Sequence, residues 1–235
     1  GGTFTPHHDW YGNYDLAIER YRGIDPHDDH LHAATITVQL SPGKSLTIVA
    51  STHAPETIAL DGAMDRQQRH EQHLLDRWAA VHPQTSFTEP DWLQQMVLAA
   101  DQFVVQRPLE GESTGRTVIA GYPWFGDWGR DTMIALPGLT IATGRPDIAR
   151  PILRTYARYI DQGMLPNQFP EEGQTPEYNT VDATLWYFEA IRAYYAATQD
   201  DDLLRELFPA LAEIIRWHQS GTRYNIHQDA DGLIY

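Results

Sequence analysis

The feature that most constrains the fold is a helical periodicity that begins at Asp91 and continues almost to the end of the sequence. Apolar residues recur there three or four positions apart, which places them on one face of a helix. The segment Val181–Thr198 is apolar nearly all round, which is typical of a helix buried on every side. We therefore predict a mainly α fold, in which amphipathic helices alternate with more apolar ones in two layers.

Further helices are predicted in this part. One runs from about Asp131 to Thr143. Another follows the spacing of Ile148 to Ile160, where Pro151 marks a late start or a kink. A helix pair, interrupted near Pro209, follows the spacing of leucines and isoleucines between residues 203 and 215. His218 lies on the same apolar side, where a histidine is usually a satisfied core residue.

The N-terminal part shows a different pattern. Ala34–Leu40 and Ser45–Ser51 each alternate apolar and polar residues around a turn, which predicts a β-hairpin with one buried face. Glu56–Val81 is mostly polar and predicts a solvated connecting helix, and His82–Pro90 is interpreted as a linker. No strand signal follows the hairpin. We divide the chain into residues 1–54, 55–90 and 91–235.

Composition excludes several classes of function. The net charge is −15, which argues against nucleic acid or an anionic membrane as a partner. No apolar run approaches about 20 residues, so no transmembrane helix is expected. The chain has no cysteine, which excludes disulfides and thiolate chemistry and fits a reducing, cytoplasmic location.

The stretch Gly121–Thr132 (GYPWFGDWGRDT) combines aromatics, glycines and three charged side chains. Aromatic faces pair with the C–H faces of sugars, while carboxylates and a guanidinium bind hydroxyls. Charge of this density is costly to bury unpaired, so a ligand site is favoured over a core segment. A second polar cluster runs from Pro166 to Asp182 and leads into the apolar helix. Together the clusters are typical of a glycosidase cleft.

Three segments carry a family resemblance: GYPWFGDWGRDTMIALPGL (121–139), LPNQFPEEG (165–173) and PEYNTVDATLWYFEA (176–190). They resemble the glucosidase domain of glycogen debranching enzymes of the amylo-α-1,6-glucosidase family, as does RYNIHQDADGLIY (223–235). Upstream, Asp9–Arg20 and the hairpin resemble the end of that family's N-terminal β-rich domain.

The resemblance implies a fold and an activity. The fold is an (α/α)6 toroid, of which about five of twelve helices fit here, preceded by the end of an antiparallel β-rich domain. The activity is inverting removal of α-1,6-linked glucose from the branch points of glycogen or limit dextrin.

Asp182 occupies the position of the family's catalytic general acid. A general acid holds its proton near neutral pH, so we expect Glu171, Glu172, Glu177 or the apolar wall of Trp186 to favour its protonated form. Without the resemblance, a residue in the first turn of a helix is the simpler interpretation.

Arg130 and Asp131 resemble the pair that grips the terminal glucose in related enzymes, far from the scissile bond. The remaining candidates for substrate binding are Trp124, Asp127, Trp128, Asn167, Tyr178 and Asn179. The family's catalytic base has no match here and is expected in sequence C-terminal to this chain, so activity of the isolated chain stays open.

Alternative functions remain. One is a glucan-binding fragment without turnover, and another is a different (α/α)6 enzyme, such as an exo-α-1,4-glucosidase or a sugar phosphorylase. We expect branched α-glucans as the partner, no cofactor and no metal. His27, His30 and His32, with neighbouring aspartates, follow no zinc spacing and are interpreted as a solvated loop.

Overall fold

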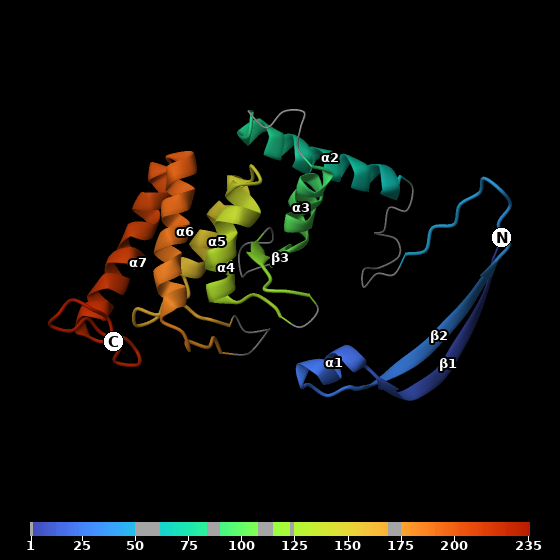
Figure 1. Cartoon of the computed structure of the whole chain (residues 1–235), viewed down its shortest axis with the longest axis horizontal. Coiled ribbons are helices and arrows are strands. Elements are labelled where there is room, and N and C mark those ends of the chain that lie inside the picture. The colour runs from blue at the N-terminus through green and yellow to red at the C-terminus, as the bar shows by residue number, and fades with distance from the viewer. Residues whose placement is uncertain (1, 50–61, 84–89, 108–114, 123–124, 169–174) are drawn as a thin grey trace. The chain divides into compact units, whose positions relative to one another are not determined.

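The computed structural model describes residues 2–49, 62–83, 90–107, 115–122, 125–168 and 175–235. The chain divides into two compact units at residues 63 and 64, and each unit is described by itself (Figure 1). None of the described helices combines the length and the apolar character needed to cross a membrane.

The N-terminal unit is built on one antiparallel pair of long strands. β1 (Gly2–Asp15) pairs with β2 (His27–Val38), and the short helix α1 (Ala17–Arg22) joins them. The register shifts at two places along the pair, and each shift leaves an irregularity in the ladder.

The predicted hairpin pairs the wrong strands. The alternating residues from Ala34 to Val38 do lie in β2, but β2 pairs with β1. The turn at Ser41 to Lys44 is present, with the amide of Lys44 bonded to the carbonyl of Ser41 at 3.0 Å. Residues 45–49 form no strand, and residues 50–51 lie outside the described residues. Alternation identifies a strand but not the strand that it pairs with.

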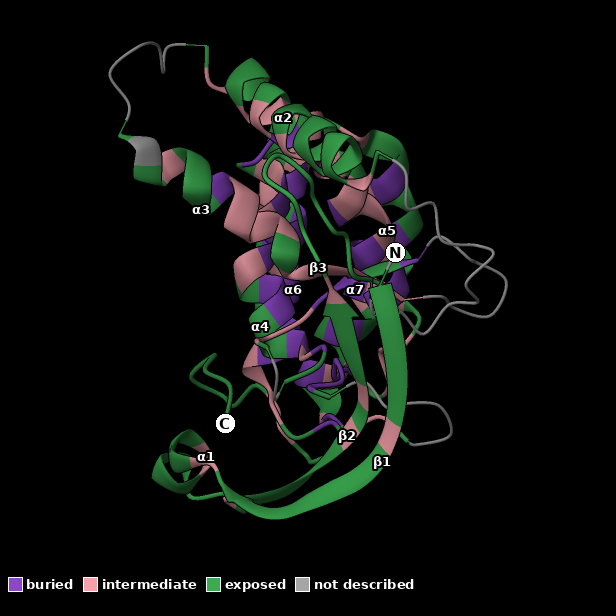
Figure 2. Cartoon of the chain, turned by 90° about the vertical axis from the view of Figure 1, so that its right-hand side faces the viewer, coloured by how far each residue is buried: buried purple, intermediate pink, exposed green. Residues whose placement is uncertain are grey.

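The predicted buried face of this hairpin is also absent from the described structure. Ile36 and Leu40 are 49% and 54% exposed. Figure 2 shows that both strands are exposed along almost their whole length, whereas the buried residues gather in the helices of the second unit.

The second unit is helical, and its core forms where α4, α5 and α7 pack against α6. The elements are α2 (Ala63–Val81), α3 (Asp91–Gln102), α4 (Gly129–Leu136), the π-helix η2 (Pro137–Ile141), α5 (Pro146–Ala157), α6 (Asp182–Thr198) and α7 (Asp201–Ser220). Core side chains include Met133, Leu136, Ile152, Leu153, Tyr156, Tyr187, Leu207 and Ile214. The prediction of a mainly helical chain with a small antiparallel pair at its N-terminal end is confirmed.

Two prolines interrupt these helices less than the sequence suggests. Pro151 lies inside α5, and Pro209 lies inside α7, which is one continuous helix and not the predicted pair. A proline removes one backbone hydrogen bond. The buried face of α7, with Leu203, Leu207 and Leu211, holds the helix together across that gap.

Two other expectations differ from the structure. α6 is buried on one face only, because Leu185 and Trp186 on its other side are 42% and 41% exposed. A short antiparallel pair, β3 (Val104–Gln106) and β4 (Arg116–Val118), does follow the N-terminal strands. A strand of three residues is too short to show an alternating pattern.

The polar helix α2 is largely exposed, as predicted, yet contacts anchor it to the helical unit. Arg77 donates from Nε and Nη2 to the carbonyl oxygen of Gly144, at 3.0 and 2.7 Å, and pairs with Asp147. Leu74 is buried. These contacts fix α2 against the start of α5.

His218 lies on the buried side of α7, as predicted. Its Nδ1 is 2.9 Å from the carbonyl oxygen of Ile214. Its Nε2 has no hydrogen-bond partner among the described residues, so the histidine is satisfied on one side only.

Asp200 caps α7 and ties it to two other helices. One carboxylate oxygen accepts the amide of Leu203 at 2.9 Å. The other accepts Nε of Arg150 on α5 and the hydroxyl of Tyr194 on α6, each at 2.9 Å. The Leu203 amide, and after it Arg150, lower the pKa of Asp200 to about 2.

We predict that Asp200→Asn destabilises the chain in a pH-dependent way. Because the folded pKa lies below that of an unfolded aspartate, the charge stabilises the fold above about pH 4 and ceases to do so as the pH falls towards about 2. The difference in free energy of unfolding between wild type and variant therefore shrinks over that range in urea titrations. Asp202→Asn, on the same helical turn, is the control, and a difference that is constant with pH contradicts the assignment.

Candidate active site

The two polar motifs lie side by side and are joined through their backbones. The amide of Gly129 donates to the carbonyl of Asn167 at 2.7 Å, and the amide of Asn167 donates to the carbonyl of Glu177 at 2.7 Å. Isolated antiparallel bridges link Trp128 to Gln168 and Gln168 to Glu177. This small ladder holds the start of α4 beside the loop that leads into α6.

Gly129 permits this approach because it has no side chain. A Cβ atom placed on it lies 2.1 Å from the carbonyl oxygen of Pro166, far inside van der Waals contact. The glycine before Arg130 is therefore required by the packing of two backbones.

Arg130 and Asp182 meet at the starts of their helices. Arg130 is the second residue of α4, and Asp182 is the first residue of α6. Nε of Arg130 lies 2.8 Å from Oδ2 of Asp182, and Nη2 donates to Oδ1 at 3.0 Å. The two side chains are 44% and 42% exposed, so a ligand can reach them. The bond to Asp182 raises the pKa of Arg130.

This pair brings together two residues that were expected to act at different places. Arg130 is predicted to hold the terminal glucose and Asp182 to be the acid, and in the structure the two side chains are in direct contact. Among the carboxylates expected beside Asp182, Glu171 and Glu172 lie outside the described residues. Glu177 bonds through Oε2 to Nδ2 of Asn179, at 3.4 Å. The opposite charges of Arg130 and Asp182 attract each other between α4 and α6. Neither sequence motif indicates this contact by itself.

Asp127 is buried and belongs to a different ion pair. It is 6% exposed and pairs with Arg107, whose Nε is 3.0 Å from its Oδ2. Burial raises the pKa of Asp127, while the charge of Arg107 acts in the opposite direction. This environment is that of an internal ion pair next to the site.

The aromatic candidates are only partly described. Trp124 lies outside the described residues. Trp128 is half-buried and packs edge-on against Phe125, with ring centroids 6.1 Å apart and planes at 80°. Trp186 follows Asp182 by one helical turn, on the same face of α6, and is partly exposed.

The other candidates divide by burial. Asn167 and Tyr178 are buried, whereas Asp131 and Asn179 are exposed. The Tyr178 hydroxyl donates to the carbonyl of Tyr159 at 2.8 Å, so that residue has a structural partner. Oδ1 of Asn167 has no partner among the residues that the structure describes.

Two family models match the chain. One, described as Amylo-alpha-1,6-glucosidase, matches residues 98–235. The other, described as Glycogen debranching enzyme N terminal, matches residues 1–47. The first covers more than half of the chain and includes every candidate site residue. The chain belongs to the amylo-α-1,6-glucosidase family.

A curated relative supports the same relationship. The glycogen debranching enzyme of Saccharomyces cerevisiae is 33% identical to this chain over 104 residues. The aligned region covers 42% of this chain and 7% of the yeast protein, so the chain matches a small part of that relative.

Two residues that support the site in this amylo-α-1,6-glucosidase domain were not predicted. Thr184, one turn into α6, accepts the amide of Leu165 through its hydroxyl at 2.7 Å. Arg223 pairs with Asp161 and lies over the ring of Tyr178, with its guanidinium carbon 4.6 Å from the ring centroid. Their contacts are long-range, and nothing in the local sequence indicates them.

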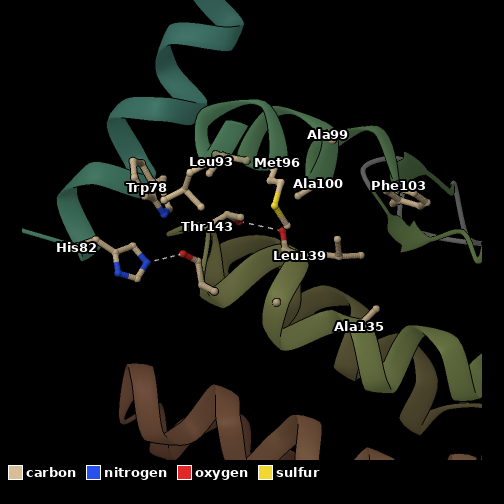
Figure 3. Close-up of a pocket in the computed structure, with 13 residues that line it drawn as sticks. Trp78, His82, Leu93, Met96, Ala99, Ala100, Phe103, Ala135, Leu139 and Thr143 are labelled. Atoms are coloured by element: carbon tan, nitrogen blue, oxygen red, sulfur yellow. Dashed lines mark hydrogen bonds between the residues drawn. The ribbon is translucent and has the colours of Figure 1, made fainter. Parts of the chain in front are cut away.

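A separate apolar cavity of about 560 Å³ lies between α2, α3 and η2 in the same domain. Figure 3 shows Trp78, Leu93 and Met96 around it. Two of the drawn polar groups are bonded within the protein: Nε2 of His82 is 2.8 Å from the carbonyl oxygen of Ala142, and the Thr143 hydroxyl donates to the carbonyl of Leu139 at 2.8 Å. No candidate site residue lines this cavity, and its apolar walls do not suit a sugar.

We predict that Gly129→Ala disrupts the candidate site. The new methyl group must displace the carbonyl of Pro166, and overpacking of this kind costs about 1–3 kcal/mol. A thermal shift assay should show a melting temperature lower by several degrees, on the order of 2–4 °C per kcal/mol. Gly126→Ala is the matched control, because a Cβ atom there meets nothing within 4 Å. Equal melting temperatures for the two variants would contradict the close approach.

Proposed function

We propose that this chain carries the acid-bearing side of a glucosidase cleft that removes α-1,6-linked glucose at branch points of glycogen or limit dextrin. Family membership supports the reaction class. The observation that carries the proposal is the exposed Arg130–Asp182 pair, which stands where the two motifs of that family meet.

For the fold, we propose that the helices belong to an (α/α)6 toroid, with α4 and α6 in the inner layer and α5 and α7 in the outer layer. The contacts of α4 with α6, and of α5 with both α6 and α7, support this arrangement. Arg130 and Asp182 then stand at the same end of two inner helices, where loops form the cleft.

In the proposed mechanism, Asp182 is the general acid. Both of its oxygens accept from Arg130 in the structure, so Asp182 must release this partner and take up a proton before it acts. It then gives the proton to the glycosidic oxygen as the bond from that oxygen to the anomeric carbon breaks. Water attacks the anomeric carbon from the opposite face and loses a proton to a base, which inverts the configuration. We assign that base to none of the described residues.

The released Arg130 has a second role in this proposal. Its planar fork of N–H donors fits two neighbouring hydroxyls of a sugar ring, so glucose replaces Asp182 as its partner. Trp128 and Trp186 supply aromatic surface for the sugar, and the same role is predicted for Trp124, which lies outside the described residues. Asp131 and Asn179 are exposed and complete the polar contacts.

The buried candidates take a different part. Asp127 and Tyr178 have structural roles next to the site. Asp127 pairs with Arg107, and the Tyr178 hydroxyl donates to the carbonyl of Tyr159. Asn167 is buried and contributes through its backbone, which bonds to Gly129 and Glu177.

We predict that Asp182→Asn abolishes glucose release from an α-1,6-branched limit dextrin but preserves binding of the dextrin. Loss of a general acid costs about 10²–10⁴-fold in rate. Arg130→Ala should weaken binding as well, because it removes the hydroxyl contacts. Glucose is measured enzymatically, and binding by isothermal titration.

Glu189→Gln is the matched control, because Glu189 is an exposed acid on the same helix that pairs with Arg192. Wild-type rates in Asp182→Asn would overturn the acid assignment. If the unmodified chain binds dextrin without releasing glucose, the chain holds only the acid-bearing side of the site or is a glucan-binding fragment. Release from linear α-1,4-glucans alone favours an exo-α-1,4-glucosidase, and release that requires phosphate favours a phosphorylase.

A further inference from the structure

Three side chains on the N-terminal strand pair bring atoms that can bind a metal close together. Nδ1 of His7 on β1 is 3.7 Å from Oδ2 of Asp9, and Nδ1 of His32 on β2 is 4.0 Å from the same oxygen. All three ligand atoms lie within 4.8 Å of one another.

An irregularity of the strand pair creates this arrangement. Asp9 and His32 are direct partners in the ladder, so their side chains share a face. Just before them, two residues of β1, His7 and His8, stand opposite the single residue Ala33 of β2. Such a bulge re-aims a side chain, and here His7 stacks on His32 with ring centroids 4.1 Å apart and planes at 18°.

The two distances from Asp9 are short enough for one small cation. The stacked rings of His7 and His32 must turn before both Nδ1 atoms point at that ion. Zinc binds imidazole nitrogen and carboxylate oxygen at about 2.0–2.2 Å, so two of its ligands lie at most about 4.4 Å apart. The separations of 3.7 and 4.0 Å from Oδ2 of Asp9 meet this limit. Nε2 of His32 is 3.1 Å from the hydroxyl of Thr35, and such a bond on the far nitrogen orients a metal-binding histidine.

We propose that His7, Asp9 and His32 bind a first-row divalent cation, best matched by Zn²⁺, which clamps β1 to β2. Two imidazoles and one carboxylate suit zinc and its neighbours, whereas Mg²⁺ and Ca²⁺ require oxygen ligands. The partial exposure of all three side chains leaves room for water to complete the coordination.

This site differs from what the sequence spacing indicates. The histidines grouped in the sequence are His27, His30 and His32, and they follow no zinc spacing. Of that group, only His32 belongs to the proposed site. The other two ligands, His7 and Asp9, come from β1, which pairs with β2 next to His32.

The test is isothermal titration of ZnCl₂ into the full, tag-free chain. We expect one ion per chain, and no comparable heat from MgCl₂. His7→Asn and His32→Asn each remove a ligand from a half-buried position. Each should weaken binding at least about tenfold, which is the smaller loss that follows from changing a residue behind a metal ligand. His8→Asn, the bulge neighbour, is the control and should bind as wild type does.

Circular dichroism of the variants shows whether they retain the wild-type fold, and Asp9→Asn tests the carboxylate independently. Absence of zinc binding by the wild-type chain overturns the proposal. Binding by His7→Asn and His32→Asn that is as strong as wild-type binding also overturns the proposal. Another group, such as His70 with Asp101, then holds the ion.

Discussion

The candidate site depends on one close approach between backbones. Gly129 lies against the carbonyl of Pro166, and its amide bonds to Asn167, which bonds in turn to Glu177. These contacts fix three segments that are far apart in the sequence. Since α4 begins at Gly129 and α6 begins five positions after Glu177, the ladder decides where both helices start. The hydroxyl of Thr184 then ties α6 to the same loop, and the core packs behind it.

The charges of Arg130 and Asp182 at the starts of α4 and α6 explain why the two side chains pair in the structure. A helix N-terminus carries a partial positive charge, which favours Asp182 at the start of α6 and disfavours Arg130 at the start of α4. Their bidentate pairing offsets the second effect, and both groups remain accessible to solvent. An uncharged glucan suits this arrangement, because its hydroxyls accept from the guanidinium without bringing a competing charge. In our account the exchange of Arg130 from Asp182 to the sugar is what prepares the acid.

The sequence predicts the helices better than the contacts between them. α6 follows from an apolar run, and α4 with η2 follows from the pattern after the glycine-rich motif. The pairing of β1 with β2 was missed, because alternation in one strand does not identify its partner. α7 runs through Pro209 because a buried leucine face outweighs one lost hydrogen bond. For the site, the motifs indicate the residues, but the Arg130–Asp182 contact and the burial of Asp127 depend on the fold. The metal-ligand group arises from a bulge that no spacing rule describes.

The most direct test of the central claim is the anomeric form of the first glucose released from an α-1,6-branched limit dextrin, followed by proton NMR. The account assigns Asp182 the role of acid in a single displacement by water. It therefore predicts that β-glucose appears first and that the α-anomer grows in later by mutarotation. Initial release of α-glucose would contradict it, because retention requires a covalent intermediate on a second carboxylate.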